Sequence, residues 1–172
     1  EDVSHQSFAS LLKSRVLDPA GMKQSTFDQP LPAHLVAQAA SGHRPDGQVV
    51  EGKYHNYPEL AAAGLWTTPT DLATFNLAVI NSWHQKQGAL LSPDLAKDFL
   101  TNQQSDKNAH PQGLGFQLIK KDGKIIGFSH GGGNEGFRGM NVGFLDGRGA
   151  VIMTNSDKGM ELINEILPAI AE

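Results

Sequence analysis

The chain has 172 residues, with 14 Lys and Arg against 18 Asp and Glu and no Cys. This length suits one compact domain with its own hydrophobic core, and the net charge of −4 gives no sign of the basic surface that nucleic-acid binding requires. The absence of Cys excludes disulfides, thiolate zinc sites and a cysteine nucleophile, and the apolar runs are too short for a membrane-spanning segment.

The first predicted helix begins at Ser4 or Ser7 and ends at Leu17. Apolar residues recur there at helical spacing, and Ser7 is a suitable N-cap. Pro19 is expected to stop this helix, since proline cannot continue a helical hydrogen-bond ladder. Turn-forming residues at 41–47 then predict a small hairpin between Ala37 and Val50.

Two more helices are predicted from their N-terminal signals. Residues 68–71 read Thr-Pro-Thr-Asp, the order of an N-cap, a proline at the first helical position and an acid in the first turn. Apolar residues follow on one face as far as Trp83. Residues 92–94, Ser-Pro-Asp, start a third and shorter helix, which is expected to bury Leu95, Phe99 and Leu100.

From Gly113 the apolar period changes from helical to alternating, which predicts strands. The first strand is expected to turn at Asp122-Gly123 and to return over residues 124–129. A second hairpin is expected to join residues 137–145 to residues 149–155.

The last segment, residues 158–171, is amphipathic and predicts a helix. The predicted fold is therefore α+β, with a helical lobe over residues 1–112 followed by an antiparallel sheet and a C-terminal helix over residues 113–172. A four-stranded sheet with one covering helix is thin. We therefore expect its second face and one edge to require a partner.

Residues 130–133, His-Gly-Gly-Gly, stand out at the end of the predicted return strand. Consecutive glycines weaken a strand, so we do not attribute them to packing. Glycine allows another backbone or a ligand to approach closely, and Asn134, which extends the turn, is expected to contact such a ligand. The alternative is that His130 only hydrogen-bonds within a glycine-rich turn.

Two formal hydrolase motifs occur in the first half of the chain. Residues 10–13 form Ser-x-x-Lys, in which one helical turn places an amine beside a hydroxyl that it can activate when desolvated. However, the apolar stripe of that helix leaves Ser10 and Lys13 on the opposite, solvated face, so we interpret them as surface residues. Tyr54 and Asn56 form Tyr-x-Asn, and we interpret Tyr54 as loop packing or a wall of a substrate cleft.

Several segments together resemble the serine β-lactamase and penicillin-binding-protein-like hydrolases, in their class C, esterase and D-aminopeptidase branch. The resemblance covers nearly the whole chain in the family's order. Its segments are residues 7–27, residues 62–73 (AAGLWTTPTDLA), residues 113–116 (GLGF), residues 129–137 (SHGGGNEGF) and residues 154–155.

This resemblance implies a β-lactamase/transpeptidase-like fold and an acyl-enzyme reaction on esters, D-amino-acid amides or β-lactams, with no cofactor or metal. His130 and the N–H of Gly133 are implied as catalytic groups, the latter as an oxyanion-hole donor. Gly131, Gly132, Asn134 and Tyr54 are implied as substrate-binding residues. His130 stands where many family members have Lys, which favours esters or amides over β-lactams.

In the family, the functional Ser-x-x-Lys and Tyr-x-Asn motifs precede the helix that begins this chain. The resemblance therefore implies that this is a C-terminal fragment, that the missing N-terminal portion of the same enzyme is its partner, and that the chain alone is inactive. A small-molecule or peptide substrate and an extracytoplasmic location, periplasmic or secreted, are also implied. The alternative is a non-catalytic relative that binds peptidoglycan-like peptides or a partner subunit.

Overall fold

The computed structural model describes residues 1–106 and 109–171; residues 107, 108 and 172, which the two predicted domain ranges include, lie outside the description. The helices of the first part are α1 (Phe8–Leu12), the π-helical turn η1 (Lys13–Leu17), α2 (Asp18–Ala20), α3 (Ala33–Val36), α4 (Leu60–Ala63), α5 (Pro69–Trp83) and α6 (Pro93–Phe99). The second part consists of β1 (Gln117–Lys121), β2 (Lys124–Asn134), β3 (Phe137–Phe144), β4 (Gly149–Thr154) and α7 (Gly159–Ala171).

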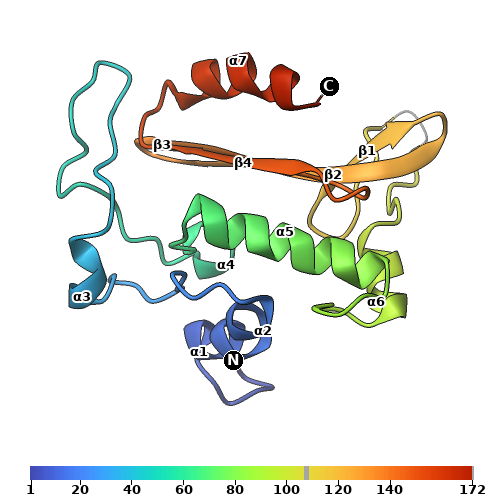
Figure 1. The fold of residues 1–172 in the computed structure, drawn as a ribbon. Coiled ribbons are helices and arrows are strands. Elements are labelled where there is room, and N and C mark those ends of the chain that lie inside the picture. Colours follow the sequence, from blue (N-terminus) through green and yellow to red (C-terminus); the bar gives the residue numbers. More distant parts are fainter. Residues whose placement is uncertain (107–108, 172) are drawn as a thin grey trace.

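The four strands form one antiparallel sheet in the order β1-β2-β3-β4. Helices α5 and α7 both pack on β3 and β4, from opposite faces of the sheet (Figure 1). The α+β prediction is confirmed. The expectation of a bare second face is wrong, because α5, which the sequence assigned to a separate helical lobe, covers it.

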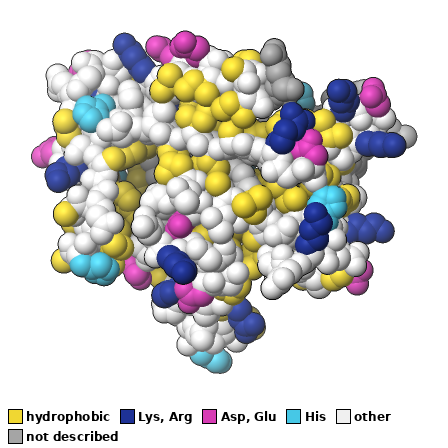
Figure 2. All heavy atoms as spheres, in the orientation of Figure 1, with side chains coloured by type: hydrophobic (Ala, Val, Ile, Leu, Met, Phe, Trp, Pro, Cys, Tyr) yellow, Lys and Arg dark blue, Asp and Glu magenta, His cyan; other side chains and the backbone are white. Residues whose placement is uncertain are grey.

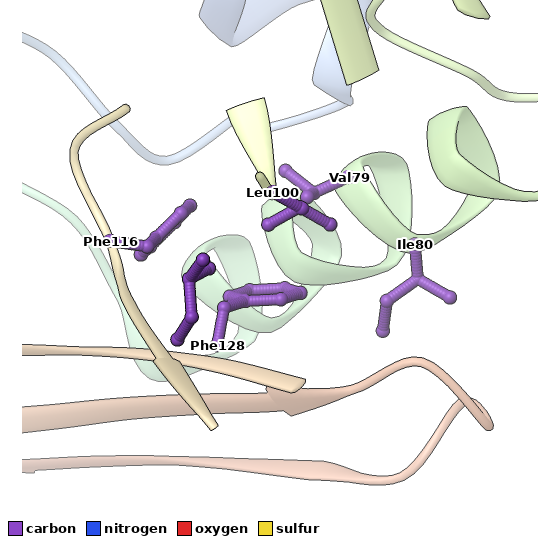
Figure 3. Close-up of a cluster of buried hydrophobic side chains, with 6 residues drawn as sticks. Val79, Ile80, Leu100, Phe116 and Phe128 are labelled. Atoms are coloured by element: carbon purple, nitrogen blue, oxygen red, sulfur yellow. The ribbon is translucent and has the colours of Figure 1, made fainter. Parts of the chain in front are cut away.

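The main core lies between α5 and the sheet (Figure 3). Phe128 of β2 lies at the centre of this core and is 0% exposed. The other buried members come from both parts of the chain: Val79, Ile80, Leu100, Phe116 and Leu118. Since the helices and strands share this core, α5 holds the sheet in place. The domain boundary at residue 112 stays a prediction.

Helix α5 begins as its sequence predicts. The Thr68 hydroxyl accepts a hydrogen bond from the N–H of Asp71 at 3.2 Å. The buried Asp71 carboxylate in turn accepts bonds from the N–H of Gln24 and the hydroxyl of Ser25, both at 2.7 Å. A carboxylate in the first turn also complements the helix dipole. Asp71 therefore ties the segment after α2 to the start of α5.

The first helical stretch differs from its prediction at its end. Pro19 lies inside α2 and does not stop the helix; the stretch ends instead at Gly21, whose φ of +77° is left-handed. The N–H of Met22 then donates to the carbonyl of Leu17 at 2.8 Å. Proline is tolerated there because it occupies the first turn of a new helix after η1, where its missing N–H leaves no broken bond.

Three other local predictions are corrected. Residues 113–116 are not strand: Gly115 has a φ of +89° and the first ladder pair begins at Gln117. Leu95 was expected to be buried but is 55% exposed. The short helix α6 turns Ala96 inward instead, and Leu100 directly after it is also buried. The hairpin expected over residues 37–50 is reduced to one bridge, between His43 and Val49.

The largest correction concerns β2. The predicted strand ended at Ser129, whereas β2 continues through the glycines to Asn134. Every residue from Gly127 to Asn134 has a partner on β3. Backbone pairing with a neighbouring strand therefore maintains an extended conformation that the glycine side chains do not favour.

Replacement of Phe128 by Ala is expected to destabilise the fold by about 3–5 kcal/mol, because it removes a fully buried ring and leaves a cavity. Urea unfolding followed by circular dichroism measures this change. Leu95→Ala is the control, and its expected cost is below about 0.5 kcal/mol since Leu95 is exposed. Equal effects of the two substitutions would contradict the location of the core.

Candidate functional site

The glycine-rich end of β2 has one bare edge. Strand β1 pairs with β2 between Lys124 and Ser129. Residues 130–134 therefore pair with β3, and no described strand lies on their other side. His130 and the three glycines after it are all exposed, and Asn134 is half-buried. The unpaired edge expected beside His130 is therefore present. We call residues 130–134 the glycine edge.

The pairing also determines which backbone groups face this edge. In an antiparallel ladder, the N–H and C=O of successive residues point alternately to the two neighbours. The N–H of Phe144 bonds toward β4, to Arg148, and the N–H of Leu145 bonds toward β2, to Ile126. Even-numbered residues of β3 therefore point toward β4. Their partners on β2 include Gly131 and Gly133, whose N–H and C=O groups must face the bare edge.

The glycines are not required by the packing of this chain. A Cβ added at Gly132 would meet nothing within 4 Å, and one at Gly131 or Gly133 would approach neighbouring atoms no closer than 3.5 Å. None of the three has a positive φ. Their role must therefore be sought outside the described residues, where a close approach by other atoms is the remaining physical use of glycine.

His130 lies at the start of the glycine edge, on the same face of the sheet as Phe128. Its ring centroid is 6.3 Å from that of Phe116, in an edge-to-face arrangement. Asn134, at the other end of the edge, donates from Nδ2 to the carbonyl of Ala63 at 3.3 Å. The end of α4 therefore adjoins the glycine edge on the α5 side of the sheet.

Tyr54 lies on the loop before α4 and packs edge-on against Trp66, with the ring centroids 4.6 Å apart. This contact agrees with the loop-packing interpretation. The neighbouring Asn56 is exposed. Tyr54 therefore packs against Trp66, which follows Gly64 at the end of α4. Among the described residues, no hydrogen bond or ring contact joins Tyr54 to His130.

Ser10 and Lys13 do not form a nucleophile–base pair. The Lys13 ammonium lies 2.5 Å from Asp18 Oδ1, and both side chains are more than half exposed, at 65% and 57%. The Ser10 hydroxyl accepts from that of Ser7. Lys13 therefore lacks the desolvated setting beside a hydroxyl that an activating amine requires. The interpretation of both residues as surface residues agrees with this geometry.

Sequence reasoning noted Glu135 as part of the glycine turn and Arg138 as an exposed strand residue, but it did not predict the contacts by which they anchor this turn. Glu135 contacts Arg44 and His55 on the loop that precedes α4. Arg138 pairs with Asp157 at 2.8 Å and donates from Nη1 to the carbonyl of Asn134 at 2.7 Å. No sequence pattern joins residues so far apart. The only signal was the presence of charged residues on both sides of an otherwise apolar and glycine-rich hairpin.

The turn also lies very close to another backbone. The N–H of His43 donates to the carbonyls of Gly136 and Asn155, at 3.3 and 3.1 Å. A Cβ on Gly136 would stand 2.7 Å from the Cα of Gly42. The two glycines thus permit the loop around residue 42 to lie directly on the hairpin.

Within residues 1–106 and 109–171, no group of three or more His, Cys, Asp or Glu side chains is arranged to hold a metal ion. In the same part of the chain, every helix is too short or too polar to cross a membrane.

A model of the family described as Beta-lactamase matches residues 1–172, the whole sequence. The chain belongs to the β-lactamase family. No curated protein matches it significantly.

Solved structures show the same fold at low identity. A penicillin-binding protein from Bacillus halodurans is 20% identical, with a TM-score of 0.73, and the match covers 97% of this chain and 50% of that one. The D-alanine carboxypeptidase AmpC from Burkholderia cenocepacia is 21% identical with a TM-score of 0.70, covering 90% and 52%. A class C β-lactamase is 17% identical with a TM-score of 0.72, covering 90% and 48%. This chain thus spans about half the length of these relatives.

Replacement of Gly136 by Ala is expected to destabilise the fold by more than about 1 kcal/mol, because a left-handed φ is unfavourable for Ala and the new Cβ meets the Gly42 backbone. The matched control is Gly147→Ala at the β3–β4 turn. Gly147 also has a positive φ, of +99°, but an added Cβ there meets nothing within 4 Å. Urea unfolding should show the larger loss at Gly136, and equal losses would contradict the close contact.

Proposed function

We propose that this chain provides the glycine-edge side of the active site of a serine hydrolase that acts through an acyl-enzyme. The observation that carries the proposal is the bare edge of β2, where the N–H groups of Gly131 and Gly133 face outward next to an exposed His130. Family membership supports the hydrolase class. The proposed substrates are esters or D-amino-acid amides, and β-lactams are less favoured.

In this proposal, substrate lies along the glycine edge as an added strand, bonded to the main chain of Gly131 and Gly133. The Gly133 N–H donates to the oxygen that becomes negative when the acyl carbon is attacked. Such a donor contributes about 3–4 kcal/mol to transition-state stabilisation. Gly132 and Asn134 complete the surface along which substrate lies, and Tyr54 forms a more distant wall beside Trp66.

His130 has a different proposed role. An imidazole at the start of the edge donates a hydrogen bond to a substrate carboxylate or carbonyl, but unlike Lys it is not a permanent cation. Substrates that depend on a strong charge at this point are therefore disfavoured. For this reason we propose esters and amides as substrates in preference to β-lactams.

The nucleophile and its base are proposed to lie in a preceding N-terminal portion of the same enzyme. Ser10 and Lys13 cannot supply them, since Lys13 is exposed and paired with Asp18. The chain also exposes apolar side chains on α7, at Leu162, Ile166 and Ile170. Figure 2 shows hydrophobic side chains gathered at the top of the view, where α7 lies in Figure 1. Surface of this kind supports a further packing partner.

A recess of about 460 Å³ between α5 and the start of β4 leaves further room for such a partner, and the half-exposed Leu77 is among the residues that line it. A chain without a nucleophile-bearing portion would instead fit the non-catalytic alternative.

In the full-length enzyme, Gly133→Pro is expected to lower kcat/KM for ester hydrolysis by about 10²–10³-fold, because it removes one oxyanion donor. Gly133→Ala is the comparison variant: it keeps the N–H, and its Cβ has room beside the Arg138 side chain at 3.5 Å, so its loss of rate, from hindered approach of substrate alone, should be smaller than that of Gly133→Pro. A fluorogenic ester assay measures both variants. If Pro and Ala give the same rate as the unmodified enzyme, the proposed role of the glycine edge is wrong.

Replacement of His130 by Lys in the full-length enzyme is expected to raise turnover of a carboxylate-bearing β-lactam relative to that of a neutral ester. A permanent cation binds a carboxylate more strongly than a neutral imidazole does, by a charge-assisted bond. Competing hydrolysis of a chromogenic β-lactam and the ester gives the ratio. His130→Gln, which keeps a donor without adding charge, should leave the ratio nearly unchanged. A Lys variant with the same ratio would contradict the placement of His130 at the substrate.

A further inference from the structure

Glu135 lies at the tip of the hairpin that follows the glycine edge, and its carboxylate contacts two side chains from one distant loop. Arg44 Nε donates to Oε1 at 2.7 Å, and His55 Nε2 lies 2.5 Å from Oε2. The backbone N–H of Glu135 also donates to the hydroxyl of Tyr57 at 3.3 Å. Three residues of the 41–57 loop therefore converge on this one residue.

The carboxylate bridges two stretches of the loop. Arg44 follows the segment that touches Gly136, and His55 adjoins Tyr54 and lies before α4. Without the Glu135 carboxylate, the backbone N–H at position 135 would still donate to the Tyr57 hydroxyl, but the contacts to Arg44 and His55 would be lost. One carboxylate thus holds both ends of the loop.

The glycine edge needs such an anchor because its own side chains supply little packing. The three glycines have no side-chain contacts, and their outer backbone groups are unpaired. Strand ends with few buried contacts open locally at low free energy. The hairpin tip is only two residues from Gly133, so motion at the tip would displace its N–H directly.

We propose that Glu135 is a positioning residue, which acts through Arg44 and His55 to hold the glycine edge in its extended conformation against the 41–57 loop. Its link to catalysis rests on the function proposed above. The anchoring itself does not require substrate, nucleophile or turnover, and so it can be tested separately.

The charges around Glu135 support an ionised carboxylate. The hydrogen bond from Arg44 is the main cause that lowers the pKa of Glu135 below its ordinary value, with a further contribution from His55. On the hairpin itself, Arg138 is paired with Asp157. On the loop, Asp46 and Glu51 act on Arg44 and raise its pKa further, after the larger effect of Glu135.

The sign of the pH dependence follows from this direction. Because the folded pKa of Glu135 is lowered, the stabilisation that it gives is fully present above the ordinary carboxyl pKa and is lost as pH falls through the lowered value. His55 forms an ion pair with Glu135 only while its ring is protonated, so acid strengthens this one contact for as long as Glu135 stays ionised. Anchoring should therefore weaken only as pH falls through the lowered pKa of Glu135.

The test is hydrogen–deuterium exchange of the chain with Glu135→Gln. Exchange is expected to rise roughly three- to thirty-fold, the range for loss of two partly exposed charge pairs, in the 41–57 loop and at Gly132 and Asn134, whose N–H groups bond to β3. The matched control is Asp146→Asn, which removes the carboxylate of the Asp146–Arg148 pair at the β3–β4 turn. It should leave exchange at the glycine edge unchanged.

Two further measurements separate positioning from a general loss of stability. Arg44→Gln should reproduce the local rise in exchange, and exchanging the two charges, Arg44→Glu with Glu135→Arg, should partly restore protection. In the unmodified chain, protection of the Gly132 and Asn134 amides should fall as pH drops through the lowered pKa of Glu135, whereas the Glu135→Gln chain should show little further change over the same pH range.

Unchanged exchange at the glycine edge in Glu135→Gln, or an equal rise in Asp146→Asn, would overturn the proposal. Failure of the proposed function has a different result, since it appears as full activity of Gly133→Pro in the complete enzyme. Raised exchange in Glu135→Gln together with full activity of Gly133→Pro would support the anchoring role of Glu135 and contradict its proposed link to catalysis.

Discussion

Pairing of β2 with β3 through consecutive glycines is the interaction on which the rest of the structure depends. Glycines confer no intrinsic strand preference. Residues 131–133 stay extended because β3 forms hydrogen bonds with every second residue of the glycine edge. The same alternation turns the N–H groups of Gly131 and Gly133 outward. The β2–β3 ladder therefore both holds the glycine edge in place and leaves its outward N–H groups free to bind other atoms.

That ladder is fixed from both faces of the sheet. On one side, Asn76 of α5 donates to Asn141 Oδ1 at 2.5 Å and to the carbonyl of Val142 at 3.3 Å, which joins the helix to β3 through buried polar groups. On the other side, α7 packs on β3 and β4. Buried hydrogen bonds of this kind favour one register, because any slip would leave them unsatisfied. The hairpin tip, by contrast, depends on the loop contacts around Glu135 and Gly136.

Local signals explain why much of the fold could be predicted. The N-cap at Thr68 and the turn at Asp122-Gly123, where both residues have positive φ, act over a few residues and appear as expected. The end of the first helix could not be predicted from Pro19 alone, since a π-helical turn before it changed its position within the helix. The length of β2 was underestimated because the glycine pattern describes a weak strand, while the pairing with β3 is non-local.

The sequence by itself determined the α+β class, the starts of α1, α5 and α6, the two hairpin turns of the sheet and the unusual glycines after His130, because each depends on short-range preferences of the backbone. Only the tertiary structure decided which edge of β2 is bare, which amides face it, and that Arg44 and His55 meet Glu135. These are relations between segments up to 91 residues apart. They arise from strand register and loop closure, which no local pattern of residues encodes.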